Sequence, residues 1–239
     1  MGEGAVEAVI FDWGGTLSEF VSVELVDAWR LAARHLDPEH EDELAARLVQ
    51  VEADFWETTS SHQRSATLAD LLARATRELG MDVAEALLEE AAVRHLDAWT
   101  PHIRHDPDAA GTLAELRDRG LRIGMLSNTH WPRAFHERFL DRDGLADLID
   151  ARLYTSEMAF QKPHLSAFLA AADALGVDPA SAVFVGDRPW DDVSGAQAAG
   201  MRTVLRPNPV APDIDGIEPD ARIERLPELV ELIDQWRRV

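Results

Sequence analysis

The feature that most constrains the fold is an alternation of short apolar runs with helical patterns, interrupted by one block that is helical only. The first apolar run, at 7–12, ends in Asp12 and is followed by two glycines. Further short runs lie at 121–126, 151–155, 182–185 and 202–205. Apolar residues at helical spacing separate them, at 107–119, 132–140, 163–175, 190–199 and 226–237. Strands that alternate with helices predict an α/β fold with a doubly wound parallel sheet.

The interrupting block runs from about 20 to 100. Apolar residues such as Val26, Trp29, Ala33 and Leu36 recur there at helical spacing, and the same period continues beyond Pro38 with no strand pattern. Because the block lies between the first strand and the rest of the sheet, we expect an insertion. The predicted domains are a core of 1–18 and 101–239 and a helical domain of 19–100. The loop 206–220 is expected to be irregular.

Composition limits the classes of function. The chain has 239 residues, of which 46% are hydrophobic, so we expect a globular protein. It has no cysteine for disulfide or thiolate chemistry, and a formal net charge of −21 that repels nucleic acid and anionic membranes. No apolar run approaches the ~18 residues of a membrane span. The acidic, Gly-rich segment 1–7 does not resemble a signal peptide, so a cytoplasmic location is expected.

Three predicted strand ends carry polar side chains. Asp12 follows the first strand, Ser127 and Asn128 follow the second, and Asp187 follows the strand at 182–185. In open parallel sheets, ligands bind at the carboxyl ends of the strands. A hydroxyl followed by backbone N–H groups can bind an anion's oxygens, as in the segment that begins at Ser127. The tight turn Gly14-Gly15 lets the backbone approach a ligand closely.

Two charged features are unusual. Lys162 is the only lysine among 23 basic residues, and it precedes Pro163 at the expected start of a helix, where the dipole disfavours a cation unless an anion is bound. Three carboxylates, on Asp187, Asp191 and Asp192, follow one buried strand and repel one another. A divalent cation with oxygen ligands, such as Mg²⁺, would relieve that repulsion.

The order and spacing of these motifs resemble the haloacid-dehalogenase-like phosphohydrolases over nearly the whole chain. Residues 11–17 match the family's first motif, Ser127 the second, Lys162 the third, and 186–192 with the following Gly-Ala pairs the fourth. The resemblance implies a Rossmann-like core and makes the helical insertion a cap over the site. It also implies a phosphatase that acts on a small phosphorylated metabolite.

The resemblance implies a role for each motif residue. Asp12 attacks phosphorus and forms an aspartyl phosphate. Mg²⁺ is bound by Asp12, Asp187 and the backbone carbonyl of Gly14, with Asp192 completing the metal site through bound water. Ser127 and Lys162 hold the phosphate oxygens, with Asn128 beside them at the substrate.

One departure from the family pattern bears on activity. The family's hydrolases usually carry a second Asp two residues after the nucleophile, as general acid and base, and here that position is Gly14. Glu19 or His130 could replace it, or the substrate could have a good leaving group. Alternatively, the protein binds a phosphometabolite without hydrolysing it, or transfers the phosphoryl group elsewhere.

The insertion is expected to select the substrate. Arg64, in a loop between helices with His62 and Ser65, could bind a second anionic group. Trp13, Trp131 and Trp190 adjoin motifs and could wall the pocket, although ordinary core packing explains them equally well.

Two relatives that lack the second Asp are disfavoured by the sequence. The insertion has no lysine for the Schiff base of phosphonoacetaldehyde hydrolases. Haloacid dehalogenases need no metal and lack the acidic fourth motif, which this chain retains. The sequence defines neither the substrate nor the oligomeric state.

Overall fold

A six-stranded parallel sheet forms the core of the protein. The computed structural model describes residues 5–20, 23–208 and 214–238. In spatial order the strands are β3 (Ala151–Tyr154), β2 (Arg122–Ser127), β1 (Ala8–Phe11), β4 (Ala182–Gly186), β5 (Arg202–Leu205) and β6 (Ala221–Arg222). All five pairings are parallel, which confirms the predicted α/β class. The two-residue strand β6 was not expected, because it follows the irregular loop and has no apolar run of its own.

The central strand is β1. Phe11 at its carboxyl end pairs in register with Met125 of β2 and Val185 of β4. The residues that follow these strands therefore meet at one edge of the sheet. This register brings together the first, second and fourth sequence motifs, which are far apart in the chain.

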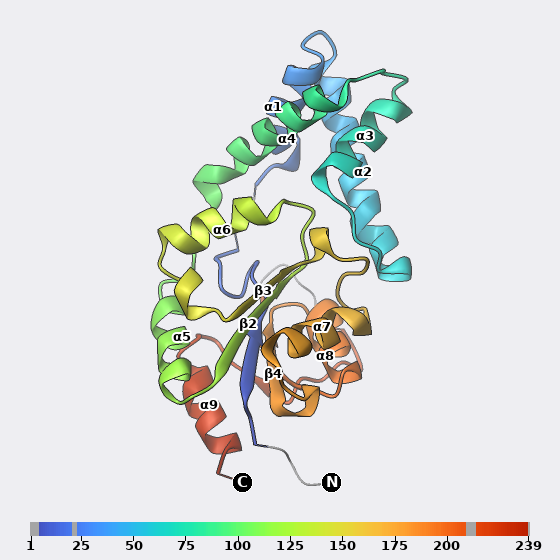
Figure 1. Ribbon diagram of the computed structural model, residues 1–239. Coiled ribbons are helices and arrows are strands. Elements are labelled where there is room, and N and C mark those ends of the chain that lie inside the picture. Colours follow the sequence, from blue (N-terminus) through green and yellow to red (C-terminus); the bar gives the residue numbers. More distant parts are fainter. Residues whose placement is uncertain (1–4, 21–22, 209–213, 239) are drawn as a thin grey trace.

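Helices cover both faces of the sheet (Figure 1). On one face, α5 (Ala109–Asp118), α6 (Arg133–Arg142) and α9 (Glu228–Trp236) pack over Val9 and Phe11. On the other, α7 (Leu165–Leu175) and α8 (Gly195–Ala198) pack over Ala8 and Ile10. Successive residues of β1 thus face opposite layers, and both are buried, as expected of a strand at the centre of a doubly wound sheet.

Two helix predictions were inaccurate at the site. The helix expected at 163–175 begins at Leu165, because the His164 side chain accepts a hydrogen bond from the Ser166 N–H and acts as the N-cap. Pro163 is therefore not the first helical residue, and Lys162 lies in a turn before the helix. The helix expected at 190–199 is a π-helical segment, Pro189–Ser194, followed by the short α8.

Four further helices form a separate helical unit beyond the carboxyl edge of the sheet (Figure 1). They are α1 (Leu25–Leu36), α2 (Glu41–His62), α3 (Leu68–Glu78) and α4 (Glu85–Trp99). The unit has its own apolar cluster, which includes Trp29, Leu48 and Leu72. In the described part of the chain, no helix combines the length and apolar character that crossing a membrane requires.

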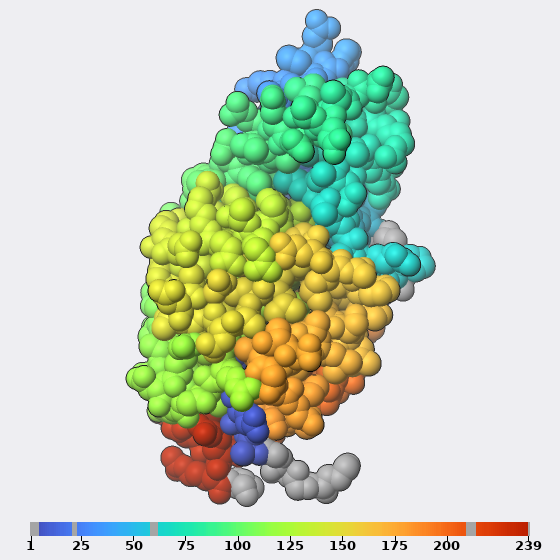
Figure 2. Space-filling model, viewed as in Figure 1, coloured from blue at the N-terminus to red at the C-terminus, as the bar shows by residue number. Residues whose placement is uncertain are grey.

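Backbone hydrogen bonds attach the helical unit to the core. The Leu68 N–H donates to the His130 carbonyl over 2.7 Å, and the Gln161 N–H donates to the Gln63 carbonyl over 2.9 Å. Figure 2 shows the unit resting against the core with no open channel between them on this face. The connection between α2 and α3 is thus held beside the loops that carry Asn128 and Lys162.

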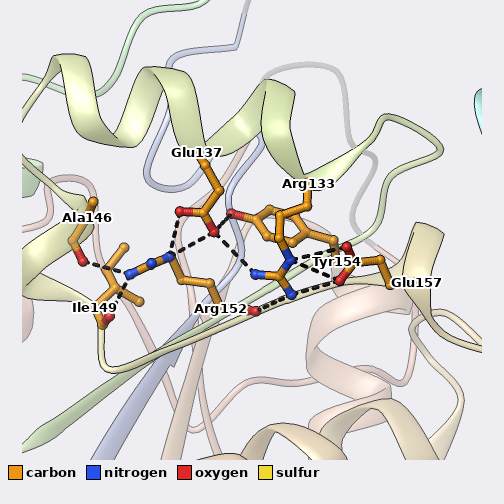
Figure 3. Close-up of polar contacts among 7 residues, drawn as sticks. All are labelled: Arg133, Glu137, Ala146, Ile149, Arg152, Tyr154 and Glu157. Carbon is orange, nitrogen blue, oxygen red and sulfur yellow. Dashed lines mark hydrogen bonds and ion pairs between the residues drawn. The ribbon is translucent and has the colours of Figure 1, made fainter.

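Helix α6 is tied to the edge strand β3 by a polar network (Figure 3). Glu137 of α6 accepts hydrogen bonds from Arg152 at 3.0 Å and from the Tyr154 hydroxyl at 3.1 Å. Arg133 of α6 pairs with Glu157, with a shortest separation of 2.7 Å. The network fixes the start of α6, and with it the loop 128–132 that leads from the sheet edge.

Candidate active site

Three carboxylates converge at the carboxyl edge of the sheet. Asp12 follows β1, Asp187 follows β4, and Asp192 projects from the π-helical segment after β4. All three are buried, and one oxygen from each lies within 4.8 Å of the others. The structure thus brings together the acids of the first and fourth motifs. Asp191, by contrast, pairs with Arg188 at 3.6 Å and is not part of this cluster.

Lys162 lies between two of these acids. Its Nζ is 2.6 Å from Asp12 Oδ1 and 2.6 Å from Asp192 Oδ1, and the side chain is 1% exposed. Burial by itself lowers the pKa of an amine, but attraction to Asp12 and Asp192 outweighs it and raises the pKa of Lys162. The ammonium is therefore stabilised by carboxylates, and not by the bound anion that its expected place at a helix start would require.

Asn128 holds the lysine segment in place. Its side-chain amide donates to the Lys162 carbonyl over 3.0 Å and accepts from the Lys162 N–H over 2.9 Å. We had expected Asn128 to bind substrate. The structure shows that its amide joins the second and third motifs, which positions Ser127 and Lys162 relative to each other. Asn128 also lines the cavity, so its contact with substrate stays a prediction.

One ammonium does not neutralise three buried carboxylates. Burial, opposed by Lys162, raises the pKa of Asp12 to about 6, and burial together with the charges of Asp12 and Asp192 raises the pKa of Asp187 to about 8. Asp187 Oδ2 accepts a hydrogen bond from Asn208 over 2.6 Å, but the buried Oδ1 has no partner among the described residues. An unsatisfied carboxylate oxygen in an acidic cluster fits a hard divalent cation such as Mg²⁺.

Asp192 differs from the other two acids in its bonding. Its Oδ2 accepts from the backbone N–H groups of Asp187 and Arg188, at 3.0 and 2.9 Å, while Oδ1 binds Lys162. Both oxygens are thus engaged within the protein. Asp192 is therefore better suited to orient Asp187 and Lys162 than to bind a metal directly.

Three glycines near the acidic cluster differ in what their positions require. Gly15 has a φ of 89°, and a Cβ there would overlap the Asp187 carboxylate. A Cβ on Gly186 would collide with Asp192. Gly14, in contrast, does not have a positive φ, and a Cβ there would meet nothing within 4 Å. Close packing therefore requires Gly15 and Gly186, whereas the space beside Gly14 is open.

A cavity of about 290 Å³ opens over the cluster. Ser127, Asn128 and Glu19 line it, as do Trp13 and Trp131. Arg64 does not, because it lies exposed over the ring of Phe160, with its guanidinium carbon 5.6 Å from the ring centroid. Trp190 also lies outside the lining. Of the expected pocket residues, Arg64 and Trp190 are thus not brought to the cavity.

The two candidate replacements for the missing acid lie in different environments. Glu19 is exposed at the cavity, at the point where the chain enters the helical unit. His130 is buried, which lowers its pKa to about 3, so its ring is neutral near pH 7. A neutral imidazole of that basicity is a poor proton donor or acceptor at this pH.

The sequence analysis overlooked Glu52 and Asn208. Glu52 lines the cavity from α2, and Asn208 hydrogen-bonds Asp187. Glu52 had a detectable signal, because it continues the apolar i, i+4 series of Leu44 and Leu48. A carboxylic acid on the buried face of a helix costs stability unless it has a partner or a function. Asn208 had no such signal in its Pro-rich loop.

Comparison with known proteins identifies the family of the chain. A family model described as haloacid dehalogenase-like hydrolase matches residues 6–200. The chain therefore belongs to the haloacid dehalogenase-like hydrolase family, as the four motifs predicted. The match spans the sheet edge and every residue of the acidic cluster.

Among individual proteins, the chain is 30% identical to a glyceraldehyde 3-phosphate phosphatase of Methanopyrus kandleri, over 95% of this chain and 97% of the relative. It is 37% identical to a phosphoserine phosphatase of Thermus thermophilus, over 52% of this chain and 49% of that protein. A solved 2-haloacid dehalogenase from Pseudomonas syringae superposes with a TM-score of 0.72 and 28% identity, covering 97% of this chain and 99% of the neighbour.

Proposed function

We propose that the protein is a Mg²⁺-dependent phosphatase that hydrolyses a small phosphorylated metabolite through an aspartyl-phosphate intermediate, with the helical unit acting as a cap over the site. The observation that carries the proposal is the buried set of Asp12, Lys162, Asp187 and Asp192, in which Asp187 Oδ1 lacks a partner. Phosphatases are also among the chain's relatives.

In the proposed reaction, Asp12 attacks phosphorus, the bond from phosphorus to the ester oxygen breaks, and the departing oxygen takes a proton from the exposed Glu19 or from solvent, since Gly14 supplies none. Lys162 holds Asp12 through Oδ1, and its charge, with the Ser127 hydroxyl, stabilises the phosphoryl oxygens. Asp12 and Asp187, with the Gly14 carbonyl, would hold Mg²⁺, which when bound neutralises the phosphoryl group and aligns it for attack. Water then attacks phosphorus and releases Asp12 and phosphate.

The acidic fourth motif supports this reaction over dehalogenation. A dehalogenase needs no divalent cation, and Asp187 would then remain as a buried, incompletely bonded acid beside Asp12. Such a group costs stability unless a cation or another function compensates for it. The two alternative functions, phosphoryl transfer and binding without turnover, both rest on the missing general acid at Gly14. Within the described part of the chain, no neighbouring side chain fills the space beside Gly14 in its place.

The proposal is tested by measuring phosphate release from a panel of phosphomonoesters and halide release from 2-haloacids. We expect phosphate release that excess chelator abolishes and added Mg²⁺ restores. Asp12→Asn, which keeps the shape of the side chain, should abolish turnover with the fold intact. Halide release that survives the chelator, with no phosphate release, would contradict the proposal and favour a dehalogenase.

A further inference from the structure

The wall that the helical unit contributes to the cavity has a distinctive composition. Among the lining residues, Leu25, Glu52, Trp56 and Trp99 come from α1, α2 and α4. Three of these are apolar or aromatic, the fourth is an acid, and none is basic. Since the core supplies the phosphate-binding groups, this wall faces the rest of the substrate.

Glu52 is held rigidly in this wall. It is 6% exposed, and its Oε2 accepts a hydrogen bond from the Trp29 indole N–H over 2.7 Å. Its Oε1 lies 3.6 Å from Nε2 of His130, which enters from the core. That separation is too long for a hydrogen bond. Burial raises the pKa of Glu52. Hydrogen bonding from the Trp29 and Trp56 side chains opposes that rise in pKa. The tryptophans of the wall therefore hold the carboxylate, and its Oε1 faces His130 with no hydrogen bond between the two residues.

His130 lies beside that oxygen with unused polar atoms. The residue is buried and lines the same cavity, and neither ring nitrogen has a hydrogen-bond partner among the described residues. Leaving a buried polar atom without a hydrogen-bond partner costs stability, because the atom has given up its bonds to water. An apolar pair would pack here without that cost, so the Glu52–His130 pair needs a reason beyond packing.

We propose that Glu52, with His130 beside it, recognises the alcohol portion of the substrate. The ligand is a phosphomonoester whose alcohol carries a hydroxyl or ammonium group on an apolar body and no carboxylate. The hydroxyl or ammonium donates to Glu52, and the tryptophans contact the apolar body. The inference rests on the proposed function for the reaction and adds the substrate class.

Charge excludes carboxylate-bearing substrates from this wall. A substrate carboxylate beside Glu52 would bring two acids together in a buried place, which is strongly unfavourable without a cation. Lys162 is already paired with Asp12 and Asp192. The two arginines that line the cavity, Arg104 and Arg188, are exposed, and Arg188 pairs with Asp191 at 3.6 Å, so neither is a buried partner for a carboxylate beside Glu52.

The test uses a matched series of straight-chain monophosphates, two to six carbons long, that end in methyl, hydroxyl, ammonium or carboxylate. At the length that reaches Glu52, kcat/KM should be highest for the hydroxyl or ammonium ester and lowest for the carboxylate. Comparing the hydroxyl ester with the ammonium ester shows which of these two groups donates to Glu52. Glu52→Gln, which still accepts from Trp29, should narrow the ammonium-to-carboxylate ratio by about tenfold or more, as expected for one charged hydrogen bond.

Binding is measured separately, by calorimetry with the matching non-hydrolysable alkylphosphonates. Glu43→Gln removes an exposed acid from the same helix outside the cavity and should leave the ratio unchanged. If no ester is hydrolysed but the hydroxyl or ammonium phosphonate binds more tightly than the carboxylate phosphonate, the proposed phosphatase function fails and the recognition by Glu52 stands. If carboxylate ligands bind best at every length, or Glu52→Gln leaves the ratio as it is, the inference is wrong.

Discussion

At Gly14 the chain keeps a backbone carbonyl where the family usually also has a carboxylic acid. The structure adds that this position is not strained. The positive φ and the close contact with Asp187 belong to Gly15, one residue further on. A positive φ would have resisted any side chain at Gly14, but Gly14 does not have one. Restoring the acid is therefore sterically feasible.

We predict that Gly14→Asp folds normally and gains turnover on alkyl phosphates. A positioned acid is worth about 10²–10⁴-fold when the leaving group is poor, and much less when it is good. The ratio of alkyl to aryl phosphate turnover should therefore rise by roughly tenfold or more. Gly14→Ala, which adds the Cβ without the acid, is the matched control. An unchanged ratio in folded Gly14→Asp would mean that another group already supplies the proton.

At the scale of the element, the segment between α2 and α3 links the helical unit to the core. Residues 63–68 hydrogen-bond the loops that hold Lys162 and Asn128, and the last of them begins α3. Thr67 closes a capping box there, in which its hydroxyl accepts from the Asp70 N–H and the Asp70 carboxylate accepts from the Thr67 N–H. The capping box at Thr67 therefore fixes both the start of α3 and part of the attachment of the helical unit to the core.

We predict that Thr67→Ala destabilises the protein by about 1 kcal/mol, the usual cost of losing an N-cap oxygen. Thr67→Ser keeps the oxygen and should be close to wild type. Urea denaturation measures the stability, and hydrogen exchange at 63–68 shows whether the attachment loosens. A Thr67→Ala protein with wild-type stability would show that the capping box contributes nothing measurable.

For the whole molecule, the sequence was sufficient to predict the sheet, the order of motifs and the acids that meet at its edge. These follow from the period of the apolar residues and from strand ends, which are local signals. The sequence did not predict the features that tertiary contacts determine. The position of Arg64 depends on how the 63–68 segment lies against the core, and the environment of Lys162 depends on residues 30 and 150 positions away.

A second whole-molecule property is a set of buried histidines in the helical unit and in the core. His95, His130 and His136 are all buried, and burial lowers the pKa of each to about 3. The rings of His95 and His130 lie 6.4 Å apart, so charging one further disfavours charging the other. The folded protein therefore keeps these rings neutral at a pH where the unfolded chain would protonate them.

The resulting dependence of stability on pH has a definite sign. The unfolded histidine has a pKa of about 6.5, so between about pH 6.5 and 3 the unfolded state binds more protons than the folded state. Each such histidine therefore removes stability as the pH falls, by up to about 1.4 kcal/mol per pH unit. The raised pKa values of Glu52, Asp12 and Asp187 act in the opposite direction. The total slope mixes both effects, so a single variant must isolate one histidine.

We predict that His95→Phe makes the free energy of unfolding less dependent on pH. A phenyl ring can keep the stacking on Trp29, where the ring centroids are 3.7 Å apart, and it loses only the hydrogen bond to the Ala28 carbonyl. That loss shifts stability equally at every pH. Between pH 6 and 5, urea denaturation should show wild type losing about 1 kcal/mol more than the variant, because only wild type must keep an unprotonated histidine at this position. Parallel curves for the two proteins over this range would show that His95 is protonated in the folded state or reaches water.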